Sequence, residues 1–188
     1  MSSVDFYKSG LVGIPIPPID QIEPFLAEEI DERWTYYCCG QTKGVSNRFL
    51  AMPSARNRIV GAQFFKFNIK GFLQWGYNFY YSKLSREVIN PYCTTDGDKA
   101  YPAGDPFSVY PYKDGCAESI RIKVFKEAIQ DMSAMQMLEA IKGKDFVVGI
   151  IEEECGDELL FNKFPFTGNY ILKYRERINQ ELKNSLSN

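Results

Sequence analysis

Histidine is absent from this chain of 188 residues. Without imidazole, the serine–histidine–aspartate and cysteine–histidine arrangements of nucleophilic catalysis cannot form, and histidine-containing metal sites are excluded as well. Any acid–base chemistry must therefore use carboxylates, tyrosines or lysines. Carboxylate chemistry is typical of glycoside hydrolysis, so this absence narrows the remaining reactions without selecting one.

A strong charge of either sign is also missing. The formal net charge is −2 and the isoelectric point is about 5.4, which argues against a nucleic-acid-binding protein, because such proteins need a basic footprint. The five cysteines are an odd-numbered set without a Cys-x-x-Cys pair, which argues against a disulfide framework and a zinc site. We therefore expect free thiols in a reducing compartment, no bound metal and no cofactor.

Long hydrophobic runs are scarce too. The opening MSSVDFYKSG contains no apolar segment of the kind found in secretory signals. The apolar runs are far shorter than the roughly 20 residues that a membrane-spanning helix needs. From these absences we predict a cytoplasmic protein with no membrane partner and no nucleic-acid partner.

What the sequence does contain is an alternation of strand-like and helix-like segments. The strand-like segments are LVGIPI (11–16), RWTYYCCG (33–40) and GFLQWGYNF (71–79). The helix-like segments between them are QIEPFLAEEI (21–30) and ARNRIVGAQFFKFNIKG (55–71), whose apolar residues recur at helical spacing. Alternation of this kind predicts parallel strands joined by right-handed crossovers.

The second half of the sequence is organised differently. Residues 82–118 form a long irregular stretch with several prolines and glycines, as expected for a binding loop or a lid. Amphipathic helices are predicted over 119–144 and over 168–186. The segment DFVVGIIEEE (145–154) fits either a short strand or a helix. We predict a single domain over residues 1–188.

Three strands are too few to close a barrel, which needs about eight strands and about 250 residues. Two folds of the α/β class therefore remain open. One is a small open sheet, and the other is the C-terminal portion of a (β/α)8 TIM-type barrel, made of three parallel βα units. The chain by itself looks incomplete, and we predict the incomplete barrel.

Several segments, taken in order, resemble the C-terminal part of the glycosidase-like barrel domains related to glycoside hydrolase family 123. They are WTYYCC (34–39), NRFLAMPSARNRIVGAQFFKFNIKGFLQWGYN (47–78), the Gly-Asp pair at 104–105 and SIRIKVFKEAIQDMSAMQMLE (119–139). The resemblance implies a (β/α)8 barrel in full-length relatives, with these strands near its end. It also implies exo-acting hydrolysis of N-acetylhexosaminides.

The resemblance further implies a substrate-assisted mechanism, in which an Asp orients the 2-acetamido group of the substrate and the adjacent Glu protonates the leaving oxygen. In the family this Asp-Glu pair follows a strand upstream of the matching region. Here Asp31-Glu32 precedes the second strand-like segment and Asp157-Glu158 follows all three, so neither pair matches. We therefore assign no catalytic residue and predict a chain that is inactive alone. An N-terminal half-barrel or a second copy of the chain is its expected partner.

Ligand contacts in such a barrel come from the carboxyl ends of the strands and from the loops after them. The resemblance favours Trp75 as a platform that stacks on a pyranose ring, with Asn78 as a hydrogen-bonding partner. The other candidate carbohydrate contacts are Tyr36, Tyr77, Asn47 and Arg48. Core packing is the alternative for the aromatic residues, and a solvated loop is the alternative for Asn47 and Arg48. The sequence leaves open which face of 71–79 points into the barrel.

Three further residues of the matching segments are predicted to hold the long loop in place. Asp105 is expected to do so through backbone hydrogen bonds within its own loop. Arg121 and Asp131 are expected to pin the loop against the barrel. All three are therefore interpreted as structural residues.

A non-enzymatic function is the alternative to a hydrolase fragment. A small α/β domain of this size could bind glycans or a protein partner through Trp75, Tyr77 and residues 82–118. The two hypotheses differ in whether sugar binding is followed by turnover.

Overall fold

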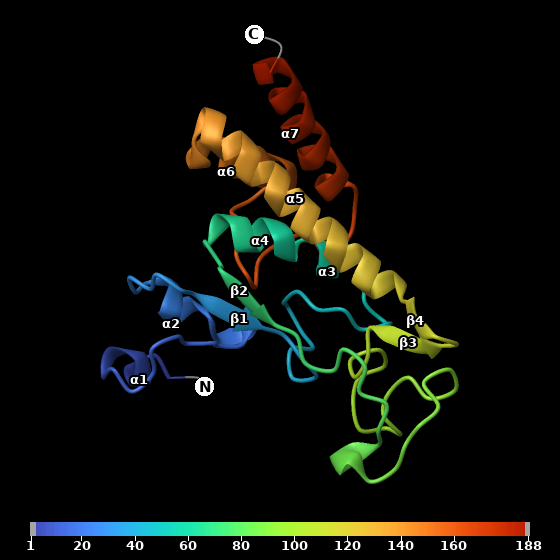
Figure 1. The fold of residues 1–188 in the computed structure, drawn as a ribbon. Helices are drawn as coiled ribbons and strands as arrows, with labels where there is room; N and C mark the ends of the chain where they lie inside the picture. Colours follow the sequence, from blue (N-terminus) through green and yellow to red (C-terminus); the bar gives the residue numbers. More distant parts are fainter. Residues whose placement is uncertain (1–2, 187–188) are drawn as a thin grey trace.

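A two-stranded parallel sheet forms the middle of the computed structural model, which describes residues 3–186 (Figure 1). Strand β1 (Trp34–Tyr36) pairs with β2 (Gly71–Leu73), with Thr35 opposite Phe72. Pro18 adds a single parallel bridge to Tyr36. The predicted α/β class is therefore confirmed, but the third predicted parallel unit is reduced to this one bridge.

One face of the sheet packs against helices α4 (Val60–Lys66) and α5 (Ile120–Lys142). The Phe72 ring lies 5.4 Å from that of Phe64 in α4 and 5.3 Å from that of Phe125 in α5, measured between ring centroids. Tyr37, the residue after β1, packs edge-on against Phe72 at 4.8 Å and is completely buried. This face is therefore part of the hydrophobic core.

The opposite face, which we call the open face, carries Trp34, Tyr36 and Leu73, because side chains alternate along a strand. Leu73 is 47 % exposed, whereas Trp34 and Tyr36 are half-buried. The Trp34 indole lies directly over Gly71, where a β-carbon would overlap it. In β2, therefore, the side chain of Phe72 faces helices α4 and α5, and the side chain of Leu73 points away from them.

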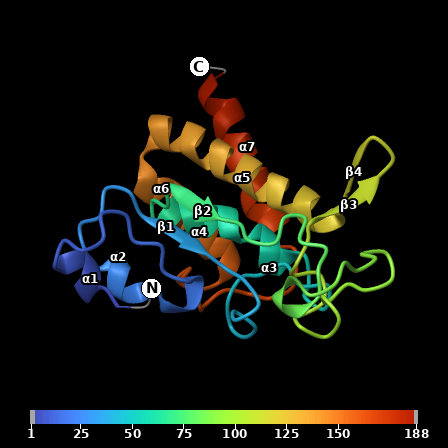
Figure 2. The same ribbon diagram turned by 60° about the horizontal axis from the view of Figure 1, so that its bottom comes forward.

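Three further helical segments pack against one another on the side of the sheet that carries α4. Helix α5 begins after Ser119, whose side chain accepts a hydrogen bond from the amide of Ile122, as an N-cap residue does. Helices α6 (Lys144–Cys155) and α7 (Tyr170–Leu186) pack on α5 (Figure 2). Among the residues buried between these helices are Met135, Leu138, Val147, Ile151, Leu159, Tyr174 and Ile178.

Helices α4 and α5 approach each other closely at Gly61. A β-carbon on Gly61 would overlap the carbonyl oxygen of Ala128 in α5. Both residues are buried, and Ala128 is itself a small residue. The contact between the two helix backbones therefore depends on the absence of a side chain at position 61.

The remaining elements are short. Their bounds are α1 (Asp5–Lys8), η1 (Ile19–Gln21), α2 (Glu23–Leu26), α3 (Ala55–Arg58) and η2 (Lys83–Ser85). Two further strands, β3 (Val109–Tyr112) and β4 (Gly115–Glu118), form an antiparallel hairpin. Figures 1 and 2 place this hairpin and the segment after β2 at the end of the molecule opposite α1 and α2.

Several predicted elements differ from those observed. LVGIPI (11–16) forms no strand, since the prolines within and after it lack the amide hydrogen that a sheet requires. The segments 33–40 and 71–79 each keep only three strand residues. The segment 21–30 is α-helical only over Glu23–Leu26, and Gln21 ends the short 3-10 helix η1. The ambiguous segment 145–154 is helical, and residues 82–118 include the β3–β4 hairpin.

Within residues 3–186, no helix is both long enough and apolar enough to span a membrane.

Candidate functional site

A buried arginine ties together the segments that follow β1 and β2. Arg48 is only 3 % exposed. Its Nη2 donates hydrogen bonds to the carbonyl oxygen of Trp75 at 3.0 Å and to that of Asp105 at 2.8 Å. The same nitrogen lies 3.6 Å from Oδ1 of Asp105, which makes an ion pair. Arg48 therefore fixes Trp75 and the long loop relative to each other.

The Asp105 carboxylate completes this arrangement from the side of the long loop. It is fully buried, and its Oδ2 accepts a hydrogen bond from the indole Nε1 of Trp75 at 3.1 Å. Burial raises the pKa of Asp105 to about 6, although the charge of Arg48 and the bond from Trp75 both act in the opposite direction. The carboxylate orients the indole plane of Trp75 through the one polar atom of that ring.

Trp75 itself is half-buried and belongs to a cluster of aromatic rings. Its ring centroid lies 5.0 Å from that of Tyr101 and 5.8 Å from that of Phe79. The chain turns immediately afterwards at Gly76, which has a φ of +61°. A β-carbon there would lie 2.8 Å from the carbonyl oxygen of Pro106, so this turn requires glycine.

An aromatic groove begins at this turn. It has a volume of about 550 Å³ and is lined by Gly76, Tyr77, Asn78, Phe79, Tyr80, Tyr81 and Val88. The side chains of Tyr77 and Asn78 are exposed to solvent. The hydroxyl of Tyr80 donates to the carbonyl oxygen of Val109 at 2.8 Å, which ties the groove to strand β3. Grooves of this size accept small organic ligands such as a monosaccharide.

The predicted ligand contacts Asn47 and Arg48 are both buried. The side-chain nitrogen Nδ2 of Asn47 donates to the carbonyl oxygens of Cys38 and Gln41, each at 2.9 Å. The side-chain oxygen Oδ1 of Asn47 accepts from the backbone amide of Arg48 at 2.8 Å. These bonds fix the segment after β1 and aim Arg48 at Trp75. Neither residue lies in the solvated loop that was the alternative.

The six predicted site residues thus fall into three places. Asn47, Arg48 and Trp75 form one bonded network at the carboxyl ends of β1 and β2. Tyr77 and Asn78 line the groove that starts one residue after Trp75. Tyr36 lies on the open face of the sheet, and its partial burial raises the pKa of its hydroxyl.

The sequence analysis did not predict a chain of hydrogen bonds that runs from Tyr37 to the long loop. The hydroxyl of Tyr37 donates to Oδ1 of Asn57 at 2.8 Å, and Nδ2 of Asn57 donates to the carbonyl oxygen of Arg121 at 2.9 Å. Nη2 of Arg121 then donates to the carbonyl oxygen of Phe107 at 2.7 Å. This last bond confirms that Arg121 pins the long loop.

The role predicted for Asp105 needs correction. Its backbone amide does bond within the loop, to the carbonyl oxygen of Pro102 at 3.0 Å. Its side chain, however, reaches across to Trp75, 30 residues away in the sequence. The sequence drew attention to Asp105 because it lies in a segment that resembles the family. The residues around it gave no indication that its side chain bonds to Trp75.

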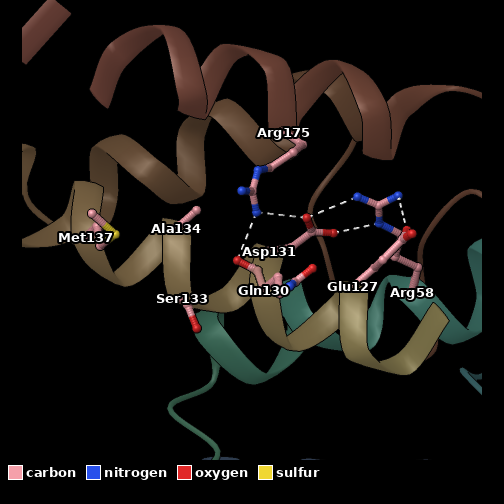
Figure 3. Close-up of a pocket in the computed structure, with 8 residues that line it drawn as sticks. All are labelled: Arg58, Glu127, Gln130, Asp131, Ser133, Ala134, Met137 and Arg175. Carbon is pink, nitrogen blue, oxygen red and sulfur yellow. Dashed lines mark hydrogen bonds and ion pairs between the residues drawn. The ribbon is translucent and has the colours of Figure 1, made fainter. Parts of the chain in front are cut away.

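A second hollow, of about 580 Å³, lies on the helices and not at the sheet (Figure 3). Asp131 of α5 pairs there with Arg58 of α3 at 2.7 Å and with Arg175 of α7 at 3.0 Å. The prediction that Asp131 pins the long loop is therefore wrong, because both of its partners lie on helices. Arg58 also pairs with Glu127 at 2.7 Å. Because these two arginines and two carboxylates neutralise one another, we interpret the hollow as a structural junction of three helices.

The two Asp-Glu dipeptides lie away from this network. Asp31 and Glu32 are exposed and precede β1, so they lie at its amino end. Asp157 and Glu158 are exposed after α6 and pair with Lys163 and Lys66, respectively. In the part of the chain that the structure describes, no group of three or more Cys, Asp or Glu residues could hold a metal ion.

The raised pKa of Asp105 predicts a specific pH dependence of stability. Because the folded-state pKa of about 6 exceeds the ordinary value of 3.8, the folded protein holds this proton more tightly than the unfolded chain. The resulting stabilisation is full below about pH 4 and is lost as the pH rises through 6. Between pH 4 and pH 7 we expect the free energy of unfolding of the wild-type protein to fall by up to about 3 kcal/mol relative to that of Asp105→Asn.

Urea denaturation of both proteins across this pH range measures the difference. Asp98→Asn, a change at an exposed loop position, is the control and should follow the wild-type curve. A difference between wild type and Asp105→Asn that stays constant with pH would contradict the raised pKa.

The fold and the network together define an α/β protein with an aromatic and polar site at the carboxyl ends of parallel strands. The sequence matches the glycoside hydrolase 123 catalytic domain over residues 1–138, and the chain therefore belongs to that family. The resemblance drawn from the sequence motifs is confirmed.

A solved structure of a family 123 glycoside hydrolase from Clostridium perfringens, studied for the details of glycolipid glycan hydrolysis, has a similar fold. It superposes with a TM-score of 0.65 at 16 % sequence identity, over 99 % of this chain and 34 % of that enzyme. This chain therefore spans about a third of the enzyme's length. No match is found among curated protein sequences.

Proposed function

We propose that this chain forms the C-terminal part of a (β/α)8 barrel and contributes one side of an N-acetylhexosaminide site. Family membership and the share of the Clostridium perfringens enzyme that the chain covers support the barrel. The observation that carries the proposal is Trp75, which follows β2 at its carboxyl end. Its indole N–H is held by the buried Asp105, so the ring is oriented before a ligand binds.

In this proposal the Trp75 ring stacks on the apolar face of a pyranose. Tyr77 and Asn78 supply the adjoining surface, with the Asn78 amide bonding to hydroxyl or acetamido groups. Tyr36 contributes from the open face of the sheet. Asn47 and Arg48 act beneath the ligand, because their bonds position Trp75.

Hydrolysis requires groups that this chain does not place at the site. Neither Asp-Glu dipeptide lies at the carboxyl end of a strand, where barrel enzymes carry their catalytic residues. We therefore propose that the chain is inactive alone. An Asp-Glu pair would come from a polypeptide that supplies the remaining strands, either an N-terminal half-barrel or another chain. The cytoplasmic location and the lack of nucleic-acid and membrane partners stay predictions from the sequence.

Sugar binding by Trp75 can be measured directly. The chain has two tryptophans, so Trp34→Phe leaves Trp75 as the only indole reporter, and its fluorescence should change on titration with N-acetylgalactosamine. Calorimetric titration should give binding at least about tenfold weaker for Trp75→Ala than for wild type, because the stacking surface is lost. Tyr92→Ala, at an exposed position outside the groove, is the matched control. Equal affinity of Trp75→Ala and wild type would refute the platform.

Turnover is tested separately with a chromogenic N-acetylhexosaminide. The chain is assayed alone and together with the polypeptide encoded upstream. We expect no release of the chromophore by the chain alone and measurable release by the mixture. An absence of turnover in both assays would remove the enzymatic part of the proposal and leave the sugar-binding part standing.

A non-enzymatic binding domain is the second candidate function. It is favoured by one observation: the groove from Gly76 to Val88 is formed by this chain without any other segment. Under this alternative, sugar binds through Trp75 and Tyr77 with the same affinity whether or not the upstream polypeptide is present. Under the leading proposal, the added polypeptide strengthens binding because it completes the site.

A further inference from the structure

A series of aromatic rings continues from the aromatic groove to the β3–β4 hairpin. The ring of Tyr80, which lines the groove, lies 5.5 Å from that of Phe107, measured between centroids. The Phe107 ring lies 5.3 Å from that of Tyr110 in β3, and the Tyr110 ring lies 5.3 Å from that of Tyr92. These contacts join three separate segments of the region after β2 into one packed unit.

Tyr92 presents an exposed ring at the end of this series. Phe107 is completely buried and Tyr110 is half-buried, whereas Tyr92 is 58 % exposed. The planes of the Tyr92 and Tyr110 rings are inclined by only 37° to each other. Tyr110 therefore supports one face of the Tyr92 ring, and the other face is open to solvent.

The exposed ring of Tyr92 is also held in place by hydrogen bonds. Its hydroxyl donates to the carbonyl oxygen of Pro111 in β3. Its backbone amide donates to Oδ1 of Asn90 at 3.0 Å. Because both ends of the residue are fixed, the ring has little conformational freedom left to lose when a ligand binds. The indole of Trp75 is fixed in a comparable way by Asp105.

The segment that forms one wall of the groove continues directly to Tyr92. Val88 lines the groove and makes an antiparallel bridge to Tyr81 on its other wall. Burial raises the pKa of the Tyr80 hydroxyl, and the neighbouring Cys116 and Tyr92 raise it further, in agreement with a position of Tyr92 close to the groove. A ligand that fills the groove can therefore extend onto the Tyr92 ring.

An oligosaccharide whose terminal unit stacks on Trp75 has to place its next units on an adjoining surface, and the groove begins one residue after Trp75. From the ring series and the fixed, exposed ring at its end, we propose that Tyr92, supported by Tyr110, is a second sugar-binding surface for a further unit of that oligosaccharide. The ring stacks on the apolar face of the sugar, and the exposed Asn90 beside it bonds to hydroxyl groups. This inference rests on the proposed function and specifies its ligand as an oligosaccharide.

Calorimetric titration compares N-acetylgalactosamine with the trisaccharide in which N-acetylgalactosamine is β-linked to lactose. We expect wild type to bind the trisaccharide about tenfold more tightly, because the second ring adds a stacking contact to a ligand that is already held. Tyr92→Ala should lose most of this advantage and keep the affinity for the monosaccharide. Tyr92→Phe retains the ring and should retain most of the advantage. Phe6→Ala, which removes an exposed ring from α1 at the opposite end of the molecule (Figure 1), is the control and should behave as wild type.

Saturation-transfer NMR on the wild-type protein provides a measurement that needs no variant. Protons of the lactose part should receive saturation from the protein, as those of the N-acetylgalactosamine unit do. Lactose protons without saturation would overturn the second surface and leave the proposed function standing. So would equal affinity of wild type for the two sugars, or a trisaccharide advantage that survives in Tyr92→Ala. An absence of binding for both sugars would overturn both proposals.

Discussion

Replacing Arg48 by methionine lowers the free energy of unfolding at pH 7 by about 3–5 kcal/mol, the expected cost of leaving a buried carboxylate without its ion-pair partner. Asp105 is fully buried and depends on Arg48 for its nearest opposite charge. The carbonyl oxygens of Trp75 and Asp105 lose a donor as well. Methionine fills much of the same volume, so the loss reports mainly the missing charge and hydrogen bonds.

Urea denaturation measures this loss, and its pH dependence identifies the cause. Without Arg48 the pKa of Asp105 rises further, so the carboxyl is neutral at pH 5 and the destabilisation should be smaller there than at pH 7. Lys163→Met is the control, because Lys163 and its partner Asp157 are both largely exposed, and it should cost less than about 1 kcal/mol. A loss for Arg48→Met that is equally small, or independent of pH, would show that the pair contributes little.

A methyl group added at Gly61 destabilises the protein by about 3 kcal/mol, at the upper end of what overpacking usually costs. The added carbon would overlap the carbonyl oxygen of Ala128, which belongs to the backbone of α5 and cannot rotate away. Helices α4 and α5 must therefore separate. Since Phe64 and Phe125 of these helices cover Phe72 of β2, the separation also loosens the sheet.

Gly149→Ala is the matched control for this change. Gly149 also lies inside a helix, α6, but a β-carbon there has nothing within 4 Å. Alanine is the better helix former, so this variant should gain up to about 1 kcal/mol. Thermal or urea unfolding of the two variants should therefore give shifts of opposite sign. A gain in stability by both variants would mean that helix propensity, and not the contact with Ala128, governs position 61.

The sequence was sufficient for those features that depend on local patterns. The alternation of apolar residues indicated the α/β class, and Ser119 marked the start of the longest helix. The motif order indicated the family, which the match over residues 1–138 confirmed. Local patterns overestimated the strands, however, because the aromatic residues of 71–79 favour a strand while the positive φ of Gly76 interrupts it.

The site could be predicted only in part, because its contacts join residues far apart in the sequence. Trp75 was identified as a candidate, but the residue that holds its indole, Asp105, comes from another segment. Arg48 was predicted as a carbohydrate contact, with a solvated loop residue as the alternative, and neither prediction indicated burial, since arginines are rarely buried. Its burial follows from three-dimensional contacts with Trp75 and Asp105, for which the sequence around position 48 carries no signal.

The hydrogen bonds of Arg48 also bear on the order in which the protein folds. They connect residues separated by 27 and 57 positions, whereas the consecutive helices α5, α6 and α7 pack on one another across shorter connecting loops. Contacts that close long loops cost more chain entropy. We therefore infer that α5, α6 and α7 assemble early and that Trp75 reaches its final orientation late, when the segment carrying Asp105 docks onto Arg48.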